Sequence, residues 1–197
     1  LVPQYADKVI SYINNVKDIK SVKHMNLNMA LSNGYLTYIG DEVLNSYISE
    51  VEKMAVYKEA SDLKIVYTPL HGTGNIPVRK VLSDMSFDVS VVNEQAVADG
   101  NFTTVRSPNP EEKDALNMAL EQAKRANADL VIGTDPDCDR VGVGVLHNGE
   151  YTLLTGNQTG ALLVDFYLEF KKQSLNPKST LVKTIVTNDL GAEIARK

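Results

Sequence analysis

Cysteine is almost absent from this chain of 197 residues: Cys138 is the only one, so an internal disulfide is excluded. A single thiol fits a reducing compartment, and we expect a cytoplasmic protein. No uninterrupted apolar run is long enough to cross a bilayer, and charges interrupt the first ten positions, where a signal peptide would have its apolar core. Basic residues are not in excess either. With 20 Lys and Arg against 25 Asp and Glu, the net charge is -5, so nucleic acid is not an expected partner.

The chain also lacks an initiator methionine, and we therefore expect it to be a piece of a longer protein. Its composition is that of an ordinary globular domain, with 43% hydrophobic and 23% charged residues. The length suffices for one full domain and part of another.

Apolar side chains recur at helical and extended spacings that alternate along the chain. Helical spacing is clear over residues 43–54, and Asp41 before them is a suitable N-cap. Segment 109–112, NPEE, combines an N-cap, a proline at the first helical position and an acid three residues after the cap, which predicts a helix start. The dipeptide Asn148-Gly149 indicates a hairpin turn. We expect helices over residues 3–17, 41–54, 76–85, 109–126, 158–171 and from 189 onward, and strands over 63–67, 87–92, 129–133, 140–146 and 180–186.

This rhythm of strands and helices predicts an α/β fold: a mostly parallel sheet with helices on both faces, followed by the start of a second α/β unit. Ligands of such sheets bind beyond the carboxyl ends of the parallel strands. Loops 68–75, 97–110 and 134–140 follow the first three strands, so we expect all three at that edge. Candidate functional side chains are therefore sought there.

The most informative loop lies in residues 133–145, GTDPDCDRVGVGV, where Asp135, Asp137 and Asp139 occupy alternate positions. Alternate side chains of an extended segment point to the same face, and the proline at 136 bends the chain so that the carboxylates can converge. Clustered carboxylate oxygens suit Mg²⁺ or another oxygen-preferring cation, and without a cation they would repel one another. Arg140 follows at once. A metal beside an arginine at a strand end is typical of sites that handle phosphate.

Three other interpretations compete with a magnesium site. A calcium EF-hand loop requires glycine at its sixth position and glutamate at its twelfth, but counting from Asp135 these positions hold Arg140 and Leu146. A phosphatase with an aspartate nucleophile would fit Asp135 after its strand, yet nothing downstream clearly supplies its other acid and its lysine. An Asp-rich turn whose carboxylates bond backbone amides remains open, although three alternating acids beside an arginine favour metal binding. We expect Cys138 to be small, partly buried and directed away from the carboxylates.

Loop 68–75, TPLHGTGN, lies between a predicted strand and a predicted helix. Its glycines permit positive φ and close backbone approach, and a helix N-terminus can bind an anion. The glycine spacing fits neither a P-loop nor a dinucleotide fingerprint. His71 is therefore a candidate for binding phosphate, with local packing or hydrogen bonding as the alternative. In the 97–110 loop, we interpret Asn109 as a helix cap and Arg106 as a solvated side chain.

Four segments carry a family resemblance: residues 133–145, 68–75, 99–112 (DGNFTTVRSPNPEE) and 153–163 (LLTGNQTGALL). Together they resemble the α-D-phosphohexomutases, in particular the bacterial phosphoglucomutase branch. Members of that family have four domains around a cleft and act through a phosphoserine and a bisphosphorylated sugar, with Mg²⁺ required. The resemblance implies an isomerase that interconverts glucose 1-phosphate and glucose 6-phosphate by way of glucose 1,6-bisphosphate. It also implies that Asp135, Asp137 and Asp139 bind Mg²⁺ and that Arg140 handles phosphate.

Three segments of that family are missing from the chain. They are the catalytic serine segment of Thr-Ala-Ser-His-Asn-Pro type, the sugar-reading loop of Gly-Glu-x-Ser type and the phosphate-gripping loop of Arg-Pro-Ser-Gly-Thr type. By resemblance, residues 1–40 form the tail of domain one, 41–150 the metal-binding domain two, and 151–197 the truncated start of domain three. We therefore expect a fragment that is inactive alone and whose partners are the remaining mutase domains. The alternatives are a phosphomannomutase or phosphopentomutase fragment, or a self-sufficient module that binds metal or phosphosugar.

Overall fold

The computed structural model describes residues 2–56, 62–176 and 178–196. The chain divides into two compact units, one up to Val43 and the other from Leu44 onward. Helix α3 (Asp41–Lys53) runs from the last residues of the first unit into the second.

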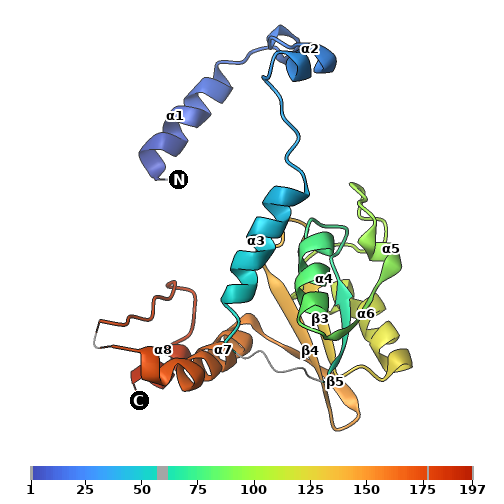
Figure 1. Ribbon diagram of the computed structural model, residues 1–197, viewed down its shortest axis with the longest axis vertical. Helices are drawn as coiled ribbons and strands as arrows, with labels where there is room; N and C mark the ends of the chain where they lie inside the picture. Colours follow the sequence, from blue (N-terminus) through green and yellow to red (C-terminus); the bar gives the residue numbers. More distant parts are fainter. Residues whose placement is uncertain (1, 57–61, 177, 197) are drawn as a thin grey trace. The chain divides into compact units, whose positions relative to one another are not determined.

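The regular elements in the described part of the first unit before α3 are the helices α1 (Pro3–Asn14), η1 (Ile19–Ser21) and α2 (Leu27–Ser32) (Figure 1). Pro3 occupies the first turn of α1, where a missing N–H costs little. The helix predicted over 3–17 is confirmed as far as Asn14. Apolar spacing does not predict η1 and α2, whose first turns are held by the side chains of Asp18 and Asn26. None of the described residues of this unit is buried.

The second unit is built on a five-stranded sheet in the order β2-β1-β3-β4-β5 (Figure 1). Its strands are β1 (Lys64–Thr68), β2 (Asp88–Val91), β3 (Leu130–Thr134), β4 (Val141–His147) and β5 (Glu150–Leu154). Its remaining helices are α4 (Asn75–Asp84), α5 (Asn93–Ala96), α6 (Lys113–Ala126), α7 (Gly156–Lys171), η2 (Lys172–Ser174) and α8 (Leu190–Arg196).

The α/β fold class is confirmed, and the sheet is mixed. β1 pairs in parallel with β2 and β3, whereas β4 is antiparallel to both β3 and β5. The parallel arrangement that we expected for most of the sheet therefore holds for three strands. The predicted hairpin is present, with positive φ at Asn148 and Gly149. It adds β5, a strand that apolar spacing alone does not predict. Because of β5, the sheet extends four residues past position 150, the predicted end of domain two.

Two predicted elements are corrected by the structure. Helix α6 begins at Lys113, four residues after the predicted cap, because segment 109–112 forms a separate turn in which the Glu112 N–H donates to the Asn109 carbonyl at 3.0 Å. The strand predicted over 180–186 is absent. A strand requires a neighbour to pair with, and no described strand pairs with this segment, in which Ile185 is 98% exposed.

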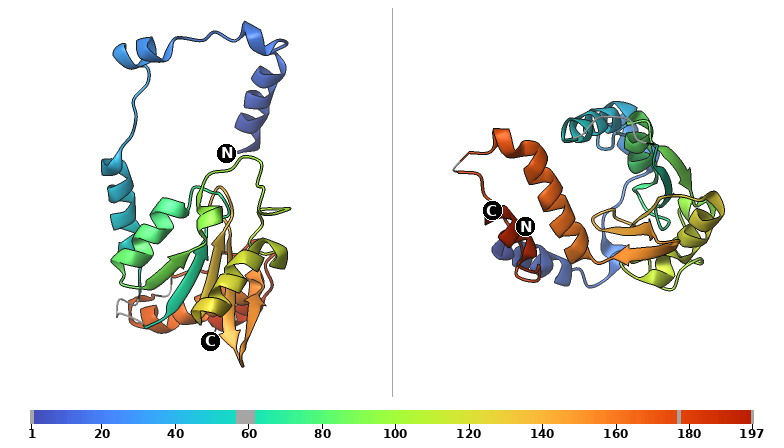
Figure 2. Two further views of the ribbon diagram at one scale, coloured as in Figure 1. Left: turned by 90° about the vertical axis from the view of Figure 1, so that its right-hand side faces the viewer. Right: turned by 90° about the horizontal axis from the view of Figure 1, so that it is seen from below.

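Helices cover both faces of the sheet (Figure 2), and β1 lies between β2 and β3. Residues 65–68 of β1 are all buried. On one face, Val66 and the neighbouring β3 residue Val131 pack against Leu116, Ala119, Leu120 and Ala123 of α6. This packing fixes the carboxyl ends of β1 and β3 side by side, which positions the loops that follow them. None of the described helices is long and apolar enough to span a membrane.

Candidate metal centre

Asp135, Asp137 and Asp139 converge in the aspartate turn, residues 134–140, which follows β3. One carboxylate oxygen from each lies within 4.8 Å of the others. The Cys138 N–H donates to the Asp135 carbonyl at 3.0 Å, and Cys138 has a φ of +60°. The predicted convergence is therefore present, but the extended conformation that we inferred for it is wrong. A proline at 136 and a left-handed residue at 138 fold the segment into a turn instead.

Asp135 organises this turn. It is 1% exposed, and its Oδ1 accepts hydrogen bonds from the backbone N–H groups of Asp139 at 3.1 Å and Arg140 at 2.9 Å. Its Oδ2 accepts a third, from Arg140 Nε at 2.9 Å. Burial raises the pKa of Asp135, but the hydrogen bonds with Arg140, Asp139 and Asp137 together outweigh burial, and the net shift of the pKa is downward. The Asp-rich turn is therefore real. It is compatible with a metal site, since each carboxylate oxygen has more than one acceptor position.

Asp137 and Asp139 differ from Asp135 because both are exposed. The Asp139 side chain is 71% exposed. Its pKa is raised by the hydrogen bond with Asp135 and by the negative charges of Asp137 and Asp135. The turn thus holds carboxylates that repel one another and that a cation would stabilise.

Arg140 lies on the same turn with part of its guanidinium unused. Its Nε donates to Asp135 Oδ2 at 2.9 Å and its Nη1 to Asn109 Oδ1 at 3.3 Å, which occupies two of the five N–H groups of an arginine. The hydrogen bond with Asp135 raises the pKa of Arg140. The other three N–H groups have no recorded partner in the described part of the chain, and the side chain is 51% exposed. A fixed cation with free donors can bind phosphate oxygens.

The histidine loop, residues 68–75, packs directly against the aspartate turn. Thr73 donates to the Pro136 carbonyl from its backbone N–H at 2.8 Å and from its hydroxyl at 3.1 Å. A Cβ on Gly72 would lie only 2.4 Å from Pro136 Cα. Glycine is therefore required at 72 for the approach of two backbones, not for the approach of a ligand.

His71 has protein partners for both ring nitrogens. It is 8% exposed, its Nδ1 lies 2.7 Å from the Val97 carbonyl, and its Nε2 lies 2.7 Å from Thr104 Oγ1. A carbonyl only accepts, so Nδ1 carries a hydrogen, and in the neutral ring Nε2 accepts from the Thr104 hydroxyl. The prediction that His71 binds phosphate is not supported by this geometry. The positive φ expected for the loop glycines falls instead on Leu70 and His71.

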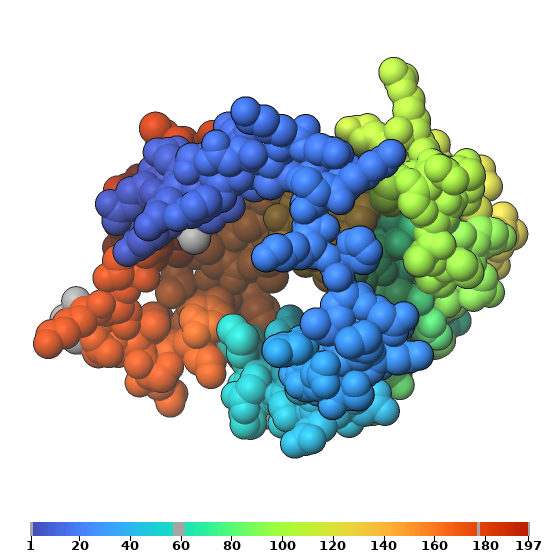
Figure 3. All heavy atoms as spheres, turned by 90° about the horizontal axis from the view of Figure 1, so that it is seen from above, coloured from blue at the N-terminus to red at the C-terminus, as the bar shows by residue number. Residues whose placement is uncertain are grey.

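Gln95 extends this network and is a residue that no sequence motif marks. It is fully buried, accepts from Thr68 Oγ1 at 2.6 Å and donates to Thr104 Oγ1 at 3.2 Å. Its backbone carbonyl accepts the His71 N–H at 2.7 Å. The network holds the base of loop 97–106, which projects from the unit (Figure 3). The network therefore ties this loop to the carboxyl end of β1.

Residues 45–148 match the family model described as phosphoglucomutase/phosphomannomutase, alpha/beta/alpha domain II. The chain belongs to this family. Among its relatives are proteins named phosphoglucomutase from Staphylococcus haemolyticus, 37% identical over 96% of the chain, and Staphylococcus saprophyticus, 32% identical over 99%. The chain spans only about a third of their length, 34% and 36% respectively.

A solved structure agrees with the family at the level of fold. A phosphoglucomutase/phosphomannomutase family protein from Burkholderia thailandensis superimposes with a TM-score of 0.55 at 19% identity, over 64% of this chain and 26% of that one. The aspartate turn and the histidine loop therefore lie on a fold that this family shares.

The other residues singled out in the sequence have mixed outcomes. Cys138 is partly buried, as expected, and with Val78 of α4 it lines an apolar groove rather than joining the carboxylate cluster. Arg106 is exposed. Asn109 is not the cap of α6: its side chain accepts from Arg140, and it therefore belongs to the site.

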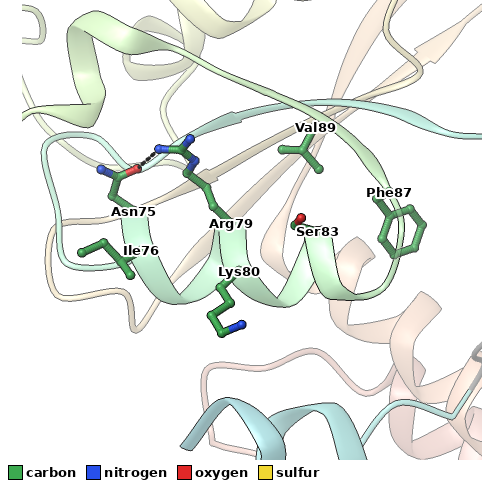
Figure 4. Close-up of a pocket in the computed structure, with 7 residues that line it drawn as sticks. All are labelled: Asn75, Ile76, Arg79, Lys80, Ser83, Phe87 and Val89. Carbon is green, nitrogen blue, oxygen red and sulfur yellow. Dashed lines mark hydrogen bonds between the residues drawn. The ribbon is translucent and has the colours of Figure 1, made fainter. Parts of the chain in front are cut away.

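A separate hollow of about 400 Å³ opens beside α4 and β2 (Figure 4). Its cations have partners: Arg79 Nη1 donates to Asn75 Oδ1 at 3.3 Å, and Lys80 pairs with Asp84 at 2.8 Å. None of residues 135–140 lines it. The aspartate turn, with its free donors and clustered acids, is the better candidate for phosphosugar chemistry.

Proposed function

We propose that the chain is the metal-binding part of a phosphoglucomutase. The intact enzyme would interconvert glucose 1-phosphate and glucose 6-phosphate through a phosphoserine and glucose 1,6-bisphosphate. One observation carries the proposal: three carboxylates and a half-exposed arginine lie together at the edge of the sheet where the parallel strands end. The chain that holds them is 37% identical to a protein named phosphoglucomutase.

The donor set of the aspartate turn fits Mg²⁺. Asp135, Asp137 and Asp139 offer hard carboxylate oxygens within 4.8 Å of one another, and two of the three residues are open to solvent, where the waters that Mg²⁺ retains have room. A bound Mg²⁺ would neutralise charge on a serine phosphate, as phosphoryl transfer requires.

Arg140 would act as the phosphate-binding residue of this turn. Asp135 fixes its Nε edge, and the free N–H groups at the other end form a fork that suits two phosphate oxygens. Because phosphoryl transfer depends mainly on positioning and charge, a rigid arginine supplies much of what the protein must contribute. His71 would stabilise the site indirectly, through its hydrogen bonds to Val97 and Thr104 of loop 97–106.

The catalytic serine and the sugar-binding segments would belong to other parts of the enzyme. We place the tail of domain one in residues 1–40, the metal-binding domain two in 41–150 and the start of domain three in 151–197. The partners of this chain are then the remaining mutase domains. On this proposal the 197-residue chain has no mutase turnover, since the group that carries phosphate is missing. Turnover of glucose 1-phosphate by the purified chain, with trace glucose 1,6-bisphosphate and Mg²⁺, would contradict it.

A Mn²⁺ titration followed by water proton relaxation tests the metal site. We expect the wild-type chain to bind Mn²⁺ weakly and Asp137→Ala to bind it much more weakly. Asp7→Ala is the matched control, since it removes an exposed acid of α1 that lies outside the cluster. Superimposable curves for wild type and Asp137→Ala would exclude the metal assignment.

Phosphomannomutase is the second candidate, because the matching family model includes both activities in its description. The two are separated by assaying the longer protein that carries this chain with glucose 1-phosphate and mannose 1-phosphate. A clear preference for the glucose compound is expected, and a preference for the mannose compound would reverse the assignment.

A further inference from the structure

We propose that Asn109 is a positioning residue that orients the Arg140 guanidinium for phosphate. The inference rests on the proposed function of Arg140 and adds a residue from a different loop. It starts from one contact: Arg140 Nη1 donates to Asn109 Oδ1 at 3.3 Å, across thirty-one residues of sequence.

The Asn109 amide is held in one orientation by its other contacts. Its Oδ1 also accepts from the Glu111 N–H at 3.2 Å, and its Nδ2 donates to Glu112 Oε1 at 3.2 Å. Ser107 Oγ donates to the same Glu112 oxygen at 3.3 Å. Because Nδ2 is engaged with a carboxylate, the oxygen and not the nitrogen of the amide faces Arg140. The acceptor is therefore preset before any ligand arrives.

The turn that carries Asn109 is anchored to the two strands that flank the aspartate turn. Pro110 is fully buried. A Cβ on Gly142 of β4 would lie 2.0 Å from the Pro110 carbonyl oxygen, and one on Gly133 of β3 would lie 3.5 Å from Pro110 Cβ. Glycine at 142 lets Pro110 sit close against the β3–β4 hairpin, whereas the Gly133 distance is an ordinary contact. Asn109 is thus fixed relative to the aspartate turn by backbone contact.

Two contacts on different groups define the plane of the Arg140 guanidinium. Asp135 holds Nε, and Asn109 holds one N–H of Nη1. The donors left for a ligand are then the second N–H of Nη1 and the two of Nη2. Without Asn109, the Asp135 contact remains but the side chain can turn about it. Phosphate would then meet a mobile fork and bind less tightly, while the carboxylates that hold the metal would be unchanged.

A double-mutant cycle in the full 197-residue chain tests this role. O-Phosphoserine is titrated at saturating Mg²⁺ into wild type, Asn109→Ala, Arg140→Ala and the double variant, and its affinity is read from backbone amide shifts by ¹H–¹⁵N NMR. Mn²⁺ affinity is measured separately by water relaxation. Asn101→Ala is the matched control, because Asn101 lies in the same 97–110 loop and its hydrogen bond to Asp99 comes from its backbone N–H.

We expect Asn109→Ala to weaken O-phosphoserine binding by about 5- to 10-fold and to leave Mn²⁺ affinity within about twofold, since one hydrogen bond to a charged group is lost. Asn109→Ala should add nothing in the Arg140→Ala background, because its effect passes through Arg140. Additive losses, or an equal loss of Mn²⁺ affinity, would show a merely structural role and overturn the inference. A normal Asn109→Ala beside a weakened Arg140→Ala would overturn it too, with the proposed function intact. Normal binding in Arg140→Ala would remove the proposed phosphate role itself.

Discussion

The histidine loop and the aspartate turn follow adjacent parallel strands and touch each other, yet they treat polar side chains in opposite ways. In the histidine loop and its partners, Thr68 and Gln95 are fully buried and His71 is 8% exposed, each bonded within the protein. In the aspartate turn, Asp139 is 71% exposed and Arg140 51%. The first region satisfies its polar groups internally, whereas the second leaves like charges and free donors at the surface.

The difference separates residues that stabilise the loops at the carboxyl ends of the strands from residues that are available there to bind a ligand. A buried, fully bonded polar network costs stability when one member is removed, because the others lose a partner. A cluster of exposed carboxylates costs stability while it is present, because the charges repel one another. Substitutions should therefore lower stability in the histidine loop and lower ligand binding in the aspartate turn.

The largest effect is expected for Arg140→Lys in the intact mutase. A lysine keeps the charge but cannot hold Asp135 through Nε and two phosphate oxygens through a fork at once. We expect turnover efficiency to fall roughly 10- to 1000-fold, about 1.4 to 4 kcal/mol of transition-state stabilisation, with the fold and metal binding retained. Steady-state kinetics and thermal melts measure both. If the lysine variant keeps most of its activity, Arg140 only pairs with its neighbouring carboxylates.

Gly72→Ala should be the most destabilising change at the contact between the two regions. The new Cβ would meet Pro136 Cα at 2.4 Å, its carbonyl oxygen at 2.6 Å and its carbonyl carbon at 2.8 Å, all backbone atoms that cannot rotate away. We expect the free energy of unfolding to fall by about 3 kcal/mol and Mn²⁺ binding to weaken. Gly100→Ala, whose Cβ meets nothing within 4 Å, is the control for urea denaturation. Equal denaturation midpoints would mean that the two loops are not tightly packed.

Tyr67 links the two regions and makes stability depend on alkaline pH. Its hydroxyl is buried and 2.8 Å from Thr134 Oγ1, and burial raises the pKa of Tyr67 from 10.0 to about 12. The folded state therefore retains the proton better than the unfolded state. This contribution is fully present below pH 10 and is lost as pH rises from 10 to 12, for roughly 3 kcal/mol in total.

Urea denaturation of wild type and Tyr67→Phe between pH 9 and 11.5 isolates the Tyr67 contribution. The comparison is needed because burial also raises the pKa of Tyr151. Wild-type stability should fall more steeply with pH than that of the variant. If the stability of both proteins fell equally with pH, Tyr67 would ionise normally and its hydroxyl would be open to water.

His71→Asn should lower stability without changing metal affinity. Asparagine tolerates the φ of +65° found at this position, so the substitution tests the ring and not the backbone. Loss of the contacts to Val97 and Thr104 should cost about 1 to 2 kcal/mol. Denaturation and Mn²⁺ titration of the same preparation give both values. A variant of normal stability with weakened phosphosugar binding would return His71 to the role of a ligand-binding residue.

Local sequence signals predict much of this fold. The apolar spacing of residues 43–54 and the dipeptide Asn148-Gly149 are short-range patterns, and α3 and the hairpin formed where they indicate. The segment around 180–186 has a comparable strand pattern but no described strand pairs with it. Helix α6 starts later than its sequence suggests because Pro110 packs against Gly142, which lies more than thirty residues further along the chain. Pairing and packing partners of this kind are not encoded in the segment itself.

The candidate site, like the fold, has parts that a short segment predicts and parts that depend on distant residues. The three aspartates and Arg140 lie within six consecutive residues, so their spacing already indicates a cluster. His71 is unmistakable as a motif residue, but its ring partners come from positions 97 and 104, and only the fold shows that both nitrogens are occupied. Asn109 fits a helix cap equally well on sequence grounds. Its contact with Arg140 depends on the register of two loops from different strands.

The smallest effect on stability is expected for Asp137→Asn in the metal-free chain, and it is the sharpest test of the comparison. Asp137 is exposed, and its negative charge helps to raise the pKa of Asp139. Removing that charge relieves repulsion inside the turn, so metal-free stability should stay within about 0.5 kcal/mol of wild type or rise slightly. Mn²⁺ should then reverse the order, because a ligand stabilises only the protein that binds it. Thermal melts of both proteins with EDTA and with Mn²⁺ measure the reversal. A metal-free loss well above 1 kcal/mol would make Asp137 a structural residue like His71, and the contrast between the two regions would no longer hold.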